Sequence, residues 1–277
     1  MPSSAEELLD MLDLRPLGGM AFEGVDPSGT HPGVFGGQLL AQALTACSRS
    51  VTADRVPHSL HAYFLRPGRP QPVEYRVEIV RDGRAFSARR AVALQDGKPI
   101  LHLSASFHTI ESGPDHQDPS PRLPIPNTTG TSGDDLTSRT GEQGIDPREW
   151  SAFEARFVDD AQTDSTSLPV WLKATERLPD APIVHCALLA YSSDFCIHAA
   201  SAAPHPGLES RTRAAMVSVD HAIWFHRQTR VDEWLLHDQQ SPSASNGLAI
   251  SRSRVFDTDG KLVASAAQEG LLRWTDN

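Results

Sequence analysis

The sequence has little of what marks several large classes of protein. Its 25 Lys and Arg residues stand against 35 Asp and Glu, which gives a net charge of −10. A protein with this net negative charge lacks the electrostatic attraction to phosphate groups that dominates binding to nucleic acids and to anionic membranes. No apolar run approaches the roughly 18 residues that a membrane-spanning helix needs, and the N-terminus lacks the basic start and apolar core of a signal peptide. We therefore expect no nucleic-acid partner and no membrane insertion.

Cysteine is scarce as well. Cys47, Cys186 and Cys196 are the three in the chain, an odd number without metal-binding spacing. This excludes a disulfide framework and a typical zinc site. The 12 histidines include no His-x-x-x-His pair around a glutamate, so no metal site is expected. Reduced thiols and the absent signal peptide together favour a cytoplasmic protein.

Several catalytic and cofactor motifs are missing. There is no Gly-x-Ser-x-Gly, no Gly-x-Gly-x-x-Gly and no P-loop, so the serine nucleophile of an α/β-hydrolase and the nucleotide cofactors of those motifs are not indicated. We expect no cofactor, and the nucleophile of any hydrolysis is better sought in water than in a side chain. The chain is nevertheless 39% hydrophobic and 22% charged, as in a folded globular protein.

A proline-rich stretch divides the 277 residues into two parts of similar size. Residues 112–135 hold five prolines among Ser, Gly and Asp, with neither helical nor strand periodicity, which indicates a linker. The predicted organisation is an N-terminal unit at 1–111, a linker at 112–148 and a C-terminal unit at 149–277.

The two parts contain an internal repeat. Leu-Leu-Ala followed by a cysteine occurs twice at an offset of 149, at 39–47 and 188–196. Two later matches have offsets of 161 and 163, namely 63–66 with 224–227 and 96–98 with 259–261. Three matches in the same order indicate a duplication. The growing offset places an insertion in the second half at about 202–213.

Each half is predicted to be one helix followed by long antiparallel strands. In the first half, an apolar helix begins at 36–37 and reaches about residue 47. Residues 73–79 then alternate apolar and charged side chains, as a half-buried strand does, and Asp-Gly pairs at 82–83 and 96–97 indicate turns. A helix followed by antiparallel strands, repeated once, is an α+β pattern.

The residues over nearly the whole chain, apart from the linker, resemble the acyl-CoA thioesterase II (TesB-like) family. The matching segments are VFGGQ at 34–38, HSLHAYFLRPG at 58–68, RDG at 81–83 with FSARR at 86–90, DH at 220–221 with WFHR at 224–227, EWLL at 233–236, and VAS at 263–265 with QEG at 268–270. The resemblance implies a double hotdog fold, in which each half wraps an antiparallel sheet around a central helix.

The resemblance also implies an activity and a site: hydrolysis of fatty acyl-CoA to a free fatty acid and CoA. The family's carboxylate falls on Asp194, its hydroxyl residue on Ser218, where some members have threonine, and its amide on Gln268. Together these groups orient and activate a water. Serine offers the same donor and acceptor as threonine with a less restricted rotamer, so the chemistry should survive.

Further groups are candidates for binding the substrate. Backbone N–H groups at a helix start can bind an oxyanion, and Gly36 and Gly37 open a helix without side chains in the way. His58 is a weaker candidate, because a histidine before an apolar strand more often makes a structural hydrogen bond. CoA phosphates could meet an arginine group formed by Arg81, Arg84, Arg89 and Arg90.

The repeat predicts one active site per chain. In the first half, Asp194 aligns with Thr45, Gln268 with Ala105, and Ser218 with Pro57 or His58. Asp220 and His221 suggest a charge relay, yet neighbouring strand residues point to opposite faces, so both cannot enter one site.

Two alternatives to the thioesterase stay open. One is a hotdog dehydratase or hydratase acting on acyl-CoA, and the other is a noncatalytic acyl-CoA-binding module. In either case a homo-oligomer is expected, because hotdog sheets expose edges and faces that association buries.

Overall fold

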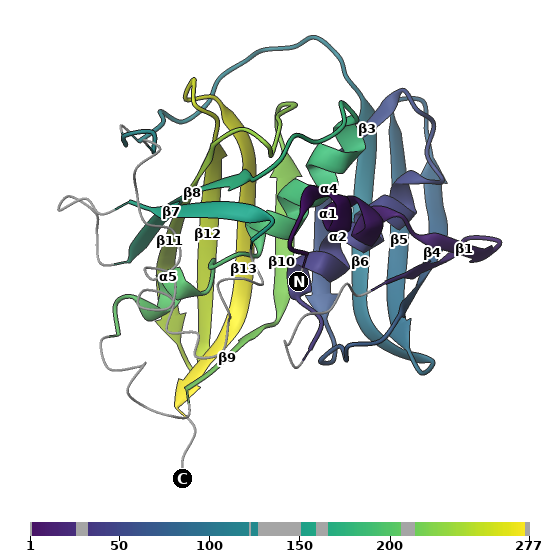
Figure 1. Cartoon of the computed structure of the whole chain (residues 1–277), viewed down its shortest axis with the longest axis horizontal. Helices are drawn as coiled ribbons and strands as arrows, with labels where there is room; N and C mark the ends of the chain where they lie inside the picture. The colour runs from purple at the N-terminus through teal and green to yellow at the C-terminus, as the bar shows by residue number, and fades with distance from the viewer. Residues whose placement is uncertain are drawn as a thin grey trace.

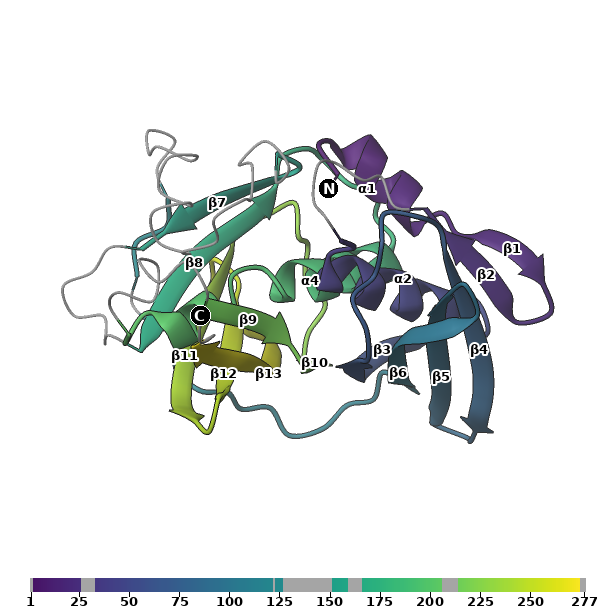
Figure 2. The same cartoon turned by 90° about the horizontal axis from the view of Figure 1, so that it is seen from below.

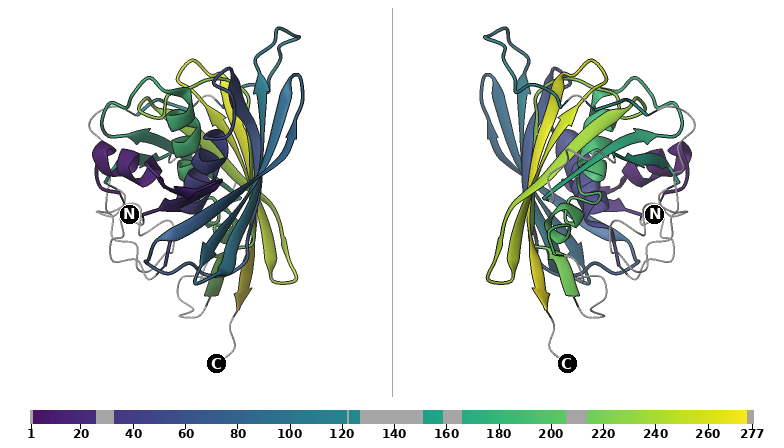
Figure 3. Two further views of the ribbon diagram at one scale, coloured as in Figure 1. Left: turned by 90° about the vertical axis from the view of Figure 1, so that its right-hand side faces the viewer. Right: turned by 90° about the vertical axis from the view of Figure 1, so that its left-hand side faces the viewer.

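Thirteen strands form one antiparallel sheet in the computed structural model, which describes residues 2–25, 33–121, 123–126, 151–158, 166–205 and 214–274. The strand order is β1-β2-β4-β5-β6-β3-β10-β13-β12-β11-β8-β7, with β9 added beside β13. Helices α2 and α4 lie on one side of the twisted sheet, and Figure 3 shows them covering that face alone. This is the double hotdog arrangement expected from the sequence.

The N-terminal half contains two helices and six strands. They are α1 (Ala5–Leu12), β1 (Arg15–Gly18), β2 (Ala21–Gly24), α2 (Gly36–Ser48), β3 (Arg55–Phe64), β4 (Val73–Asp82), β5 (Phe86–Gln95) and β6 (Lys98–Thr109). A capping box starts α1: the Ser4 hydroxyl accepts from the Glu7 backbone N–H at 3.2 Å, and the Ser3 N–H donates to the Glu7 carboxylate at 2.6 Å.

The C-terminal half repeats this plan with additions. Its elements are β7 (Phe153–Phe157), β8 (Ser167–Ala174), α4 (Pro182–Ser193), α5 (Ala199–Ala202), β9 (Ala214–Ser218), β10 (Asp220–Phe225), β11 (Leu235–Ser245), β12 (Leu248–Phe256) and β13 (Leu262–Trp274). In Figure 1 this half, coloured teal to yellow, lies beside the purple to blue N-terminal half, and the two halves meet at the centre of the sheet.

The halves join where β3 pairs with β10. Under the repeat offset of 161, His61 corresponds to Ala222, and these two residues are cross-strand partners. A pseudo-two-fold axis through this pair relates the two halves, as a duplication predicts. The same correspondence matches the bulge of β3 between Pro57 and Ser59 with the break between β9 and β10 at Val219.

One hydrophobic core spans both halves. Helices α2 and α4 contact each other and bury Leu40 and Leu44 together with Leu188 and Leu189 between them and the sheet. Burying such side chains contributes about 1.5–3 kcal/mol each, so the two halves stabilise each other. The thiols of Cys47 and Cys196 are buried, and that of Cys186 is half-buried.

The hairpin turns follow the Asp-Gly and Asn-Gly pairs of the sequence. Asp96 and Gly97 have φ values of 48° and 70°, and Asn246 and Gly247 have 55° and 77°. Positive φ at both central residues is the signature of a type I′ turn, which Asn-Gly and Asp-Gly favour. The turn predicted at 96–97 is thus confirmed.

The described part of the linker crosses the face of the sheet that lacks helices, as Figure 2 shows. Gln117 holds it in place, because its Nε2 donates to the Gly260 carbonyl at 2.8 Å and its Oε1 accepts from the Leu262 N–H at 3.1 Å. Residues 127–150 lie outside the described residues, as does most of the predicted insertion, so the boundaries at 111 and 149 stay predictions.

Candidate functional site

The start of α2 and the end of α4 meet above the central strands. A Cβ placed on Gly36 would lie 2.6 Å from Asp194 Oδ2 and 3.1 Å from the Phe64 ring of β3. The backbone of α2 therefore approaches the Asp194 carboxylate as closely as a residue without a side chain permits.

Asp194 is the C-cap of α4 and is half-buried. The partial negative charge at the end of α4 disfavours a carboxylate there, whereas the partial positive charge at the start of α2 favours it. Cys196, two residues on, has a φ of 56°, a left-handed conformation that turns the chain away from the helix axis. The carboxylate is thus presented at the junction of the two halves.

Ser218 and Gln268 form a direct pair on neighbouring strands. Ser218 ends β9 and lies opposite Gly270 of β13. The Gln268 Nε2 donates to Ser218 Oγ at 3.0 Å, and Gln268 is fully buried while Ser218 is half-buried. Two of the three predicted catalytic residues are therefore brought together as the resemblance implied.

The third residue, Asp194, makes no direct hydrogen bond to Ser218 or Gln268 within the described residues. It is linked to them through its neighbour in the sequence: Ser193 Oγ lies 2.9 Å from His221 Nε2, and His221 Nδ1 hydrogen-bonds Gln268 Oε1. A continuous polar chain thus extends from the end of α4 through β10 and β13 to Ser218.

His221 is the site residue that sequence reasoning missed. The alternation argument was correct, because Asp220 accepts from the Glu269 N–H at 2.8 Å while His221 points to the buried face. The signal lay in the repeat, where the position equivalent to His221 is Leu60. Burial lowers the pKa of His221, an effect that the Asp194 carboxylate and the Gln268 contact oppose.

His198 forms another wall of the site. Its ring lies directly over Gly270, where any Cβ would collide with it. Burial lowers the pKa of His198 and the Asp194 carboxylate opposes this effect. Its Nε2 is buried without a hydrogen-bond partner among the described residues. The carboxylate, the two imidazoles and the amide therefore share one neighbourhood.

Gly36 and Gly37 have different surroundings. Gly36 faces Asp194, as described above. A Cβ on Gly37 would overlap the Tyr191 carbonyl oxygen and the Phe35 ring, so Gly37 permits the close approach of α2 to α4. Both N–H groups lie in the first turn of α2 and so have no acceptor within the helix.

His58 lies elsewhere. Its Nε2 is 2.7 Å from Ser106 Oγ, and its ring packs edge-on against Phe86 and His108. Ser106 lies between the buried Ala105 and Phe107 of β6 and so faces the opposite side of the sheet. His58 has no part in the site that we propose.

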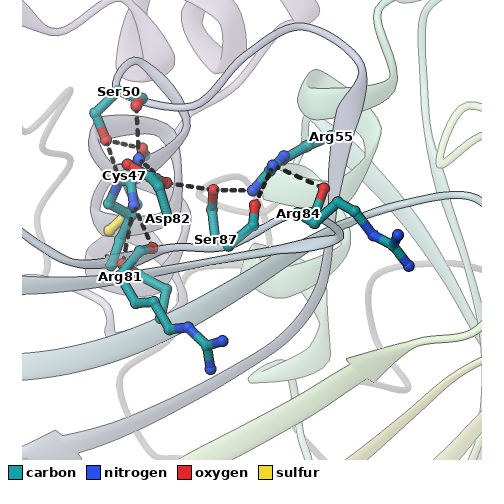
Figure 4. Close-up of polar contacts among 10 residues, drawn as sticks. Cys47, Ser50, Arg55, Arg81, Asp82, Arg84 and Ser87 are labelled. Carbon is teal, nitrogen blue, oxygen red and sulfur yellow. Dashed lines mark hydrogen bonds and ion pairs between the residues drawn. The ribbon is translucent and has the colours of Figure 1, made fainter.

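The arginine group separates into different roles. Arg89 is only 2% exposed and binds Ser50 of the loop after α2 through Nε at 2.7 Å, and Asp82 through Nη2 at 2.9 Å. The Ser87 hydroxyl and Arg89 hold the pKa of Asp82 below its usual value. In Figure 4 the guanidinium groups of Arg81 and Arg84 point away from these contacts.

Arg90 pairs with Glu78 at 3.6 Å. Of the four arginines named for CoA phosphates, Arg89 therefore stabilises the hairpin between β4 and β5, and Arg81 and Arg84 remain exposed candidates.

The fold, together with the buried polar chain of its C-terminal half, defines a double hotdog protein. Two family models match: "Acyl-CoA thioesterase" at residues 152–271 and "Acyl-CoA thioesterase N-terminal domain" at residues 26–108. Acyl-CoA thioesterase 2 of Haemophilus influenzae is 34% identical over the full length of both chains. Human acyl-coenzyme A thioesterase 8 is 33% identical over 95% of this chain and 88% of its own.

A solved structure agrees with these sequences. The crystal structure of an acyl-CoA thioesterase II from Mycobacterium marinum has a TM-score of 0.83 and 33% identity, and the match covers 98% of each chain. The chain therefore belongs to the acyl-CoA thioesterase II family and is a thioester hydrolase. No helix in the described ranges has both the length and the hydropathy to cross a membrane.

Proposed function

We propose that this protein hydrolyses fatty acyl-CoA to a free fatty acid and CoA by means of a water activated by Asp194, Ser218 and Gln268. The observation that carries this proposal is the buried Gln268 amide donating to Ser218 Oγ beside the α4 terminus that presents Asp194. A buried amide and hydroxyl are costly to place in a core unless they have partners, and here each is the other's partner.

The reaction needs a base, an oriented water and a site for the oxyanion. Asp194 accepts a proton as the water oxygen attacks the thioester carbonyl, and Ser218 holds the water through the hydroxyl that Gln268 fixes. The carbonyl oxygen becomes an oxyanion, which the N–H of Gly36 at the start of α2 stabilises. When the carbon–sulfur bond breaks, Asp194 returns the proton to the CoA sulfur.

We propose that each chain has one such site. Thr45 and Ala105, which stand in the N-terminal half where Asp194 and Gln268 stand in the other, carry neither a carboxylate nor an amide. Thr45 Oγ1 donates to the Ala41 carbonyl within its own helix at 2.8 Å. The N-terminal half supplies only the start of α2.

The test is thiol release from a series of acyl-CoA substrates by the wild type, Asp194→Asn and the matched control Thr45→Ala. Asp194→Asn should lower kcat by about 10²–10⁴-fold, the usual contribution of a general base, while Thr45→Ala retains it. Full activity of a folded Asp194→Asn variant would overturn the proposal. Hydration of an enoyl-CoA without thiol release would favour a dehydratase, and binding without turnover would favour a binding module.

We also propose that the chain forms a homo-oligomer through the sheet face that lacks helices. Tyr63, Phe86 and Trp224 are exposed on strands of that face. Contiguous exposed apolar patches mark contact surfaces. Light scattering should give a multiple of the 30.1 kDa chain mass, and Trp224→Glu should lower that multiple.

A further inference from the structure

The polar chain behind Ser218 has an apolar counterpart in the other half. Ser193, His221 and Gln268 correspond, at the repeat offsets of 149, 161 and 163, to the buried Leu44, Leu60 and Ala105. Leu60 and Ala105 are cross-strand partners, just as His221 and Gln268 lie on the adjoining strands β10 and β13. The same place in the fold is filled by aliphatic groups in one half and by hydrogen-bonded groups in the other.

The fold itself therefore does not require these polar groups. Three aliphatic side chains fill this place in the N-terminal half, and removing an imidazole, a hydroxyl and an amide from water has a cost that only complete hydrogen bonding offsets. A polar chain kept at such a place points to a role in the chemistry beside it.

The direction of the hydrogen bonds identifies that role. Gln268 Nε2 faces Ser218, so Gln268 Oε1 faces His221 and can only accept. His221 Nδ1 then carries the proton and donates it to Gln268 Oε1. The Ser193 hydroxyl lies 2.9 Å from both His221 Nε2 and the Ala190 carbonyl, so its proton can go to either acceptor. The Nδ1–H of His221 and the Nε2–H of Gln268 both point toward Ser218, whose own proton is left free for the reacting water.

The opposite tautomer of His221 would reverse the direction of the hydrogen bond between Gln268 and Ser218. With Nδ1 unprotonated, the Gln268 amide would have to turn its nitrogen toward His221 and its oxygen toward Ser218. The Ser218 hydroxyl would then donate its proton to Gln268 Oε1, and it could only accept a hydrogen bond from the water. The protonation of one buried imidazole thus decides which way the catalytic hydroxyl works.

We propose that His221 is a positioning residue that fixes the Gln268 amide, through its Nδ1–H, in the one orientation that leaves the Ser218 hydroxyl free to donate. The inference rests on the proposed roles of Gln268 and Ser218. Burial of His221 supports it, because burial lowers the pKa of this imidazole and keeps it neutral, as a single-proton tautomer requires. Asp194 and Asp220 oppose that shift, and His198 also lies in this neighbourhood.

Three substitutions separate the two nitrogen atoms of His221. His221→Asn keeps an amide near Nδ1, so it can still reach Gln268, whereas His221→Gln keeps an amide near Nε2 and reaches only Ser193. His221→Leu installs the side chain that the N-terminal half uses at Leu60. His226→Gln, which alters an exposed contact with Ser265 at 2.9 Å, is the matched control.

The expected result is a split between kcat and KM. His221→Leu and His221→Gln should lower kcat by about 10- to 100-fold, the range for a coupled neighbour, with KM within about twofold of the wild type. His221→Asn should recover most of kcat, and His226→Gln should match the wild type. Equal kcat in His221→Asn and His221→Gln, or rescue by His221→Gln alone, would overturn the proposal.

A double-mutant cycle separates this inference from the function beneath it. If His221 acts through Gln268, then His221→Leu should cost nothing further in a Gln268→Ala background. If the two single-variant losses in kcat multiply in the double variant, the two residues act independently and the proposal is refuted. If Gln268→Ala alone keeps full kcat, the proposed role of Gln268 fails, and with it the reason for positioning it.

The tautomer can be observed directly. In the chain labelled with ¹⁵N-histidine, the signal absent from His221→Asn should show a neutral ring protonated at Nδ1, unchanged between pH 6 and pH 8. A ring protonated at Nε2 only, or a charged ring, would overturn the proposal whatever the kinetics of the variants.

Discussion

The two halves of the molecule share one architecture and differ in chemistry. Each half has a long helix against a sheet, and the register of β3 against β10 relates them by a pseudo-two-fold axis. Three of the aligned positions that differ concern the site: Thr45 against Asp194, Ala105 against Gln268, and Leu60 against His221. Function in this fold therefore depends on individual side chains at matching positions and not on a separate domain.

A difference in helix length accompanies these differences. Helix α2 continues to Ser48, so Thr45 lies inside it and bonds its own helix. Helix α4 ends at Ser193, which leaves Asp194 at the cap, beside the start of α2. Because α4 ends earlier than α2, the position that lies inside the helix at Thr45 lies at the helix end at Asp194, where the carboxylate is exposed to the site.

The largest effect should come from removing the amide or the hydroxyl of the C-terminal half. Gln268→Ala and Ser218→Ala should each lower kcat for acyl-CoA by about 10²–10³-fold, as expected when an oriented donor is lost from an active site. Ser218→Thr is the control and should stay near the wild type, because it keeps the hydroxyl. A wild-type kcat in both alanine variants would show that Gln268 and Ser218 do not distinguish the C-terminal half chemically from the N-terminal half.

Gly36 and Gly37 give a sharper test of the junction. Gly36→Ala should displace the Asp194 carboxylate, 2.6 Å from the new methyl group, and lower kcat by about tenfold or more at a similar Tm. Gly37→Ala should instead overpack α2 against Tyr191 and cost about 1–3 kcal/mol of stability. Thermal melts and thiol-release assays on both variants test this expectation. A loss of stability in Gly36→Ala together with a loss of kcat alone in Gly37→Ala would show that the two glycines have the opposite roles.

Arg89 and Arg84 allow a buried arginine that stabilises the fold to be compared with an exposed arginine that could bind a CoA phosphate. Arg89→Met removes charged hydrogen bonds from the buried side of the N-terminal half, so it should cost about 2 kcal/mol, or about 4–8 °C in Tm. Arg84→Ala should leave Tm unchanged and raise KM for acyl-CoA if this exposed guanidinium meets a phosphate. Unchanged KM in Arg84→Ala would exclude that contact, and unchanged Tm in Arg89→Met would contradict the structural role.

Acid should destabilise the fold in part through a buried imidazole of the C-terminal half. Burial lowers the pKa of His237 to about 3, from the ordinary value of 6.5, so the folded state holds this imidazole neutral. Below about pH 6.5 the unfolded chain binds a proton that the folded chain does not, and stability falls as pH falls toward 3, by at most about 1.4 kcal/mol per pH unit.

Melting curves at pH 7 and pH 5 test this expectation. His237→Leu should narrow the difference in Tm between the two values of pH, whereas the exposed control His102→Gln should leave it unchanged. An equal acid shift in wild type and His237→Leu would place the acid sensitivity elsewhere in the molecule.

The sequence alone predicted the double hotdog fold, the repeat and the type of reaction. Asp-Gly pairs, strand alternation and Leu-Leu-Ala matches are local signals that predicted an α+β repeat, whereas the double hotdog fold and the type of reaction came from the resemblance to the thioesterase family. The sequence offered His221 only as half of a charge relay with Asp220, and its contact with Gln268 escaped prediction because that partner is 47 residues away. Arg89 looked like a surface cation because sequence shows charge and not burial.

The central claim is that a duplicated fold carries one reactive site, made by the C-terminal half at its junction with α2. Calorimetric titration of the wild type with a nonhydrolysable acyl-CoA thioether tests this claim most directly. One equivalent bound per chain, competing with substrate hydrolysis at a matching constant, is the predicted result. Two equivalents per chain, both competing with hydrolysis, would contradict it.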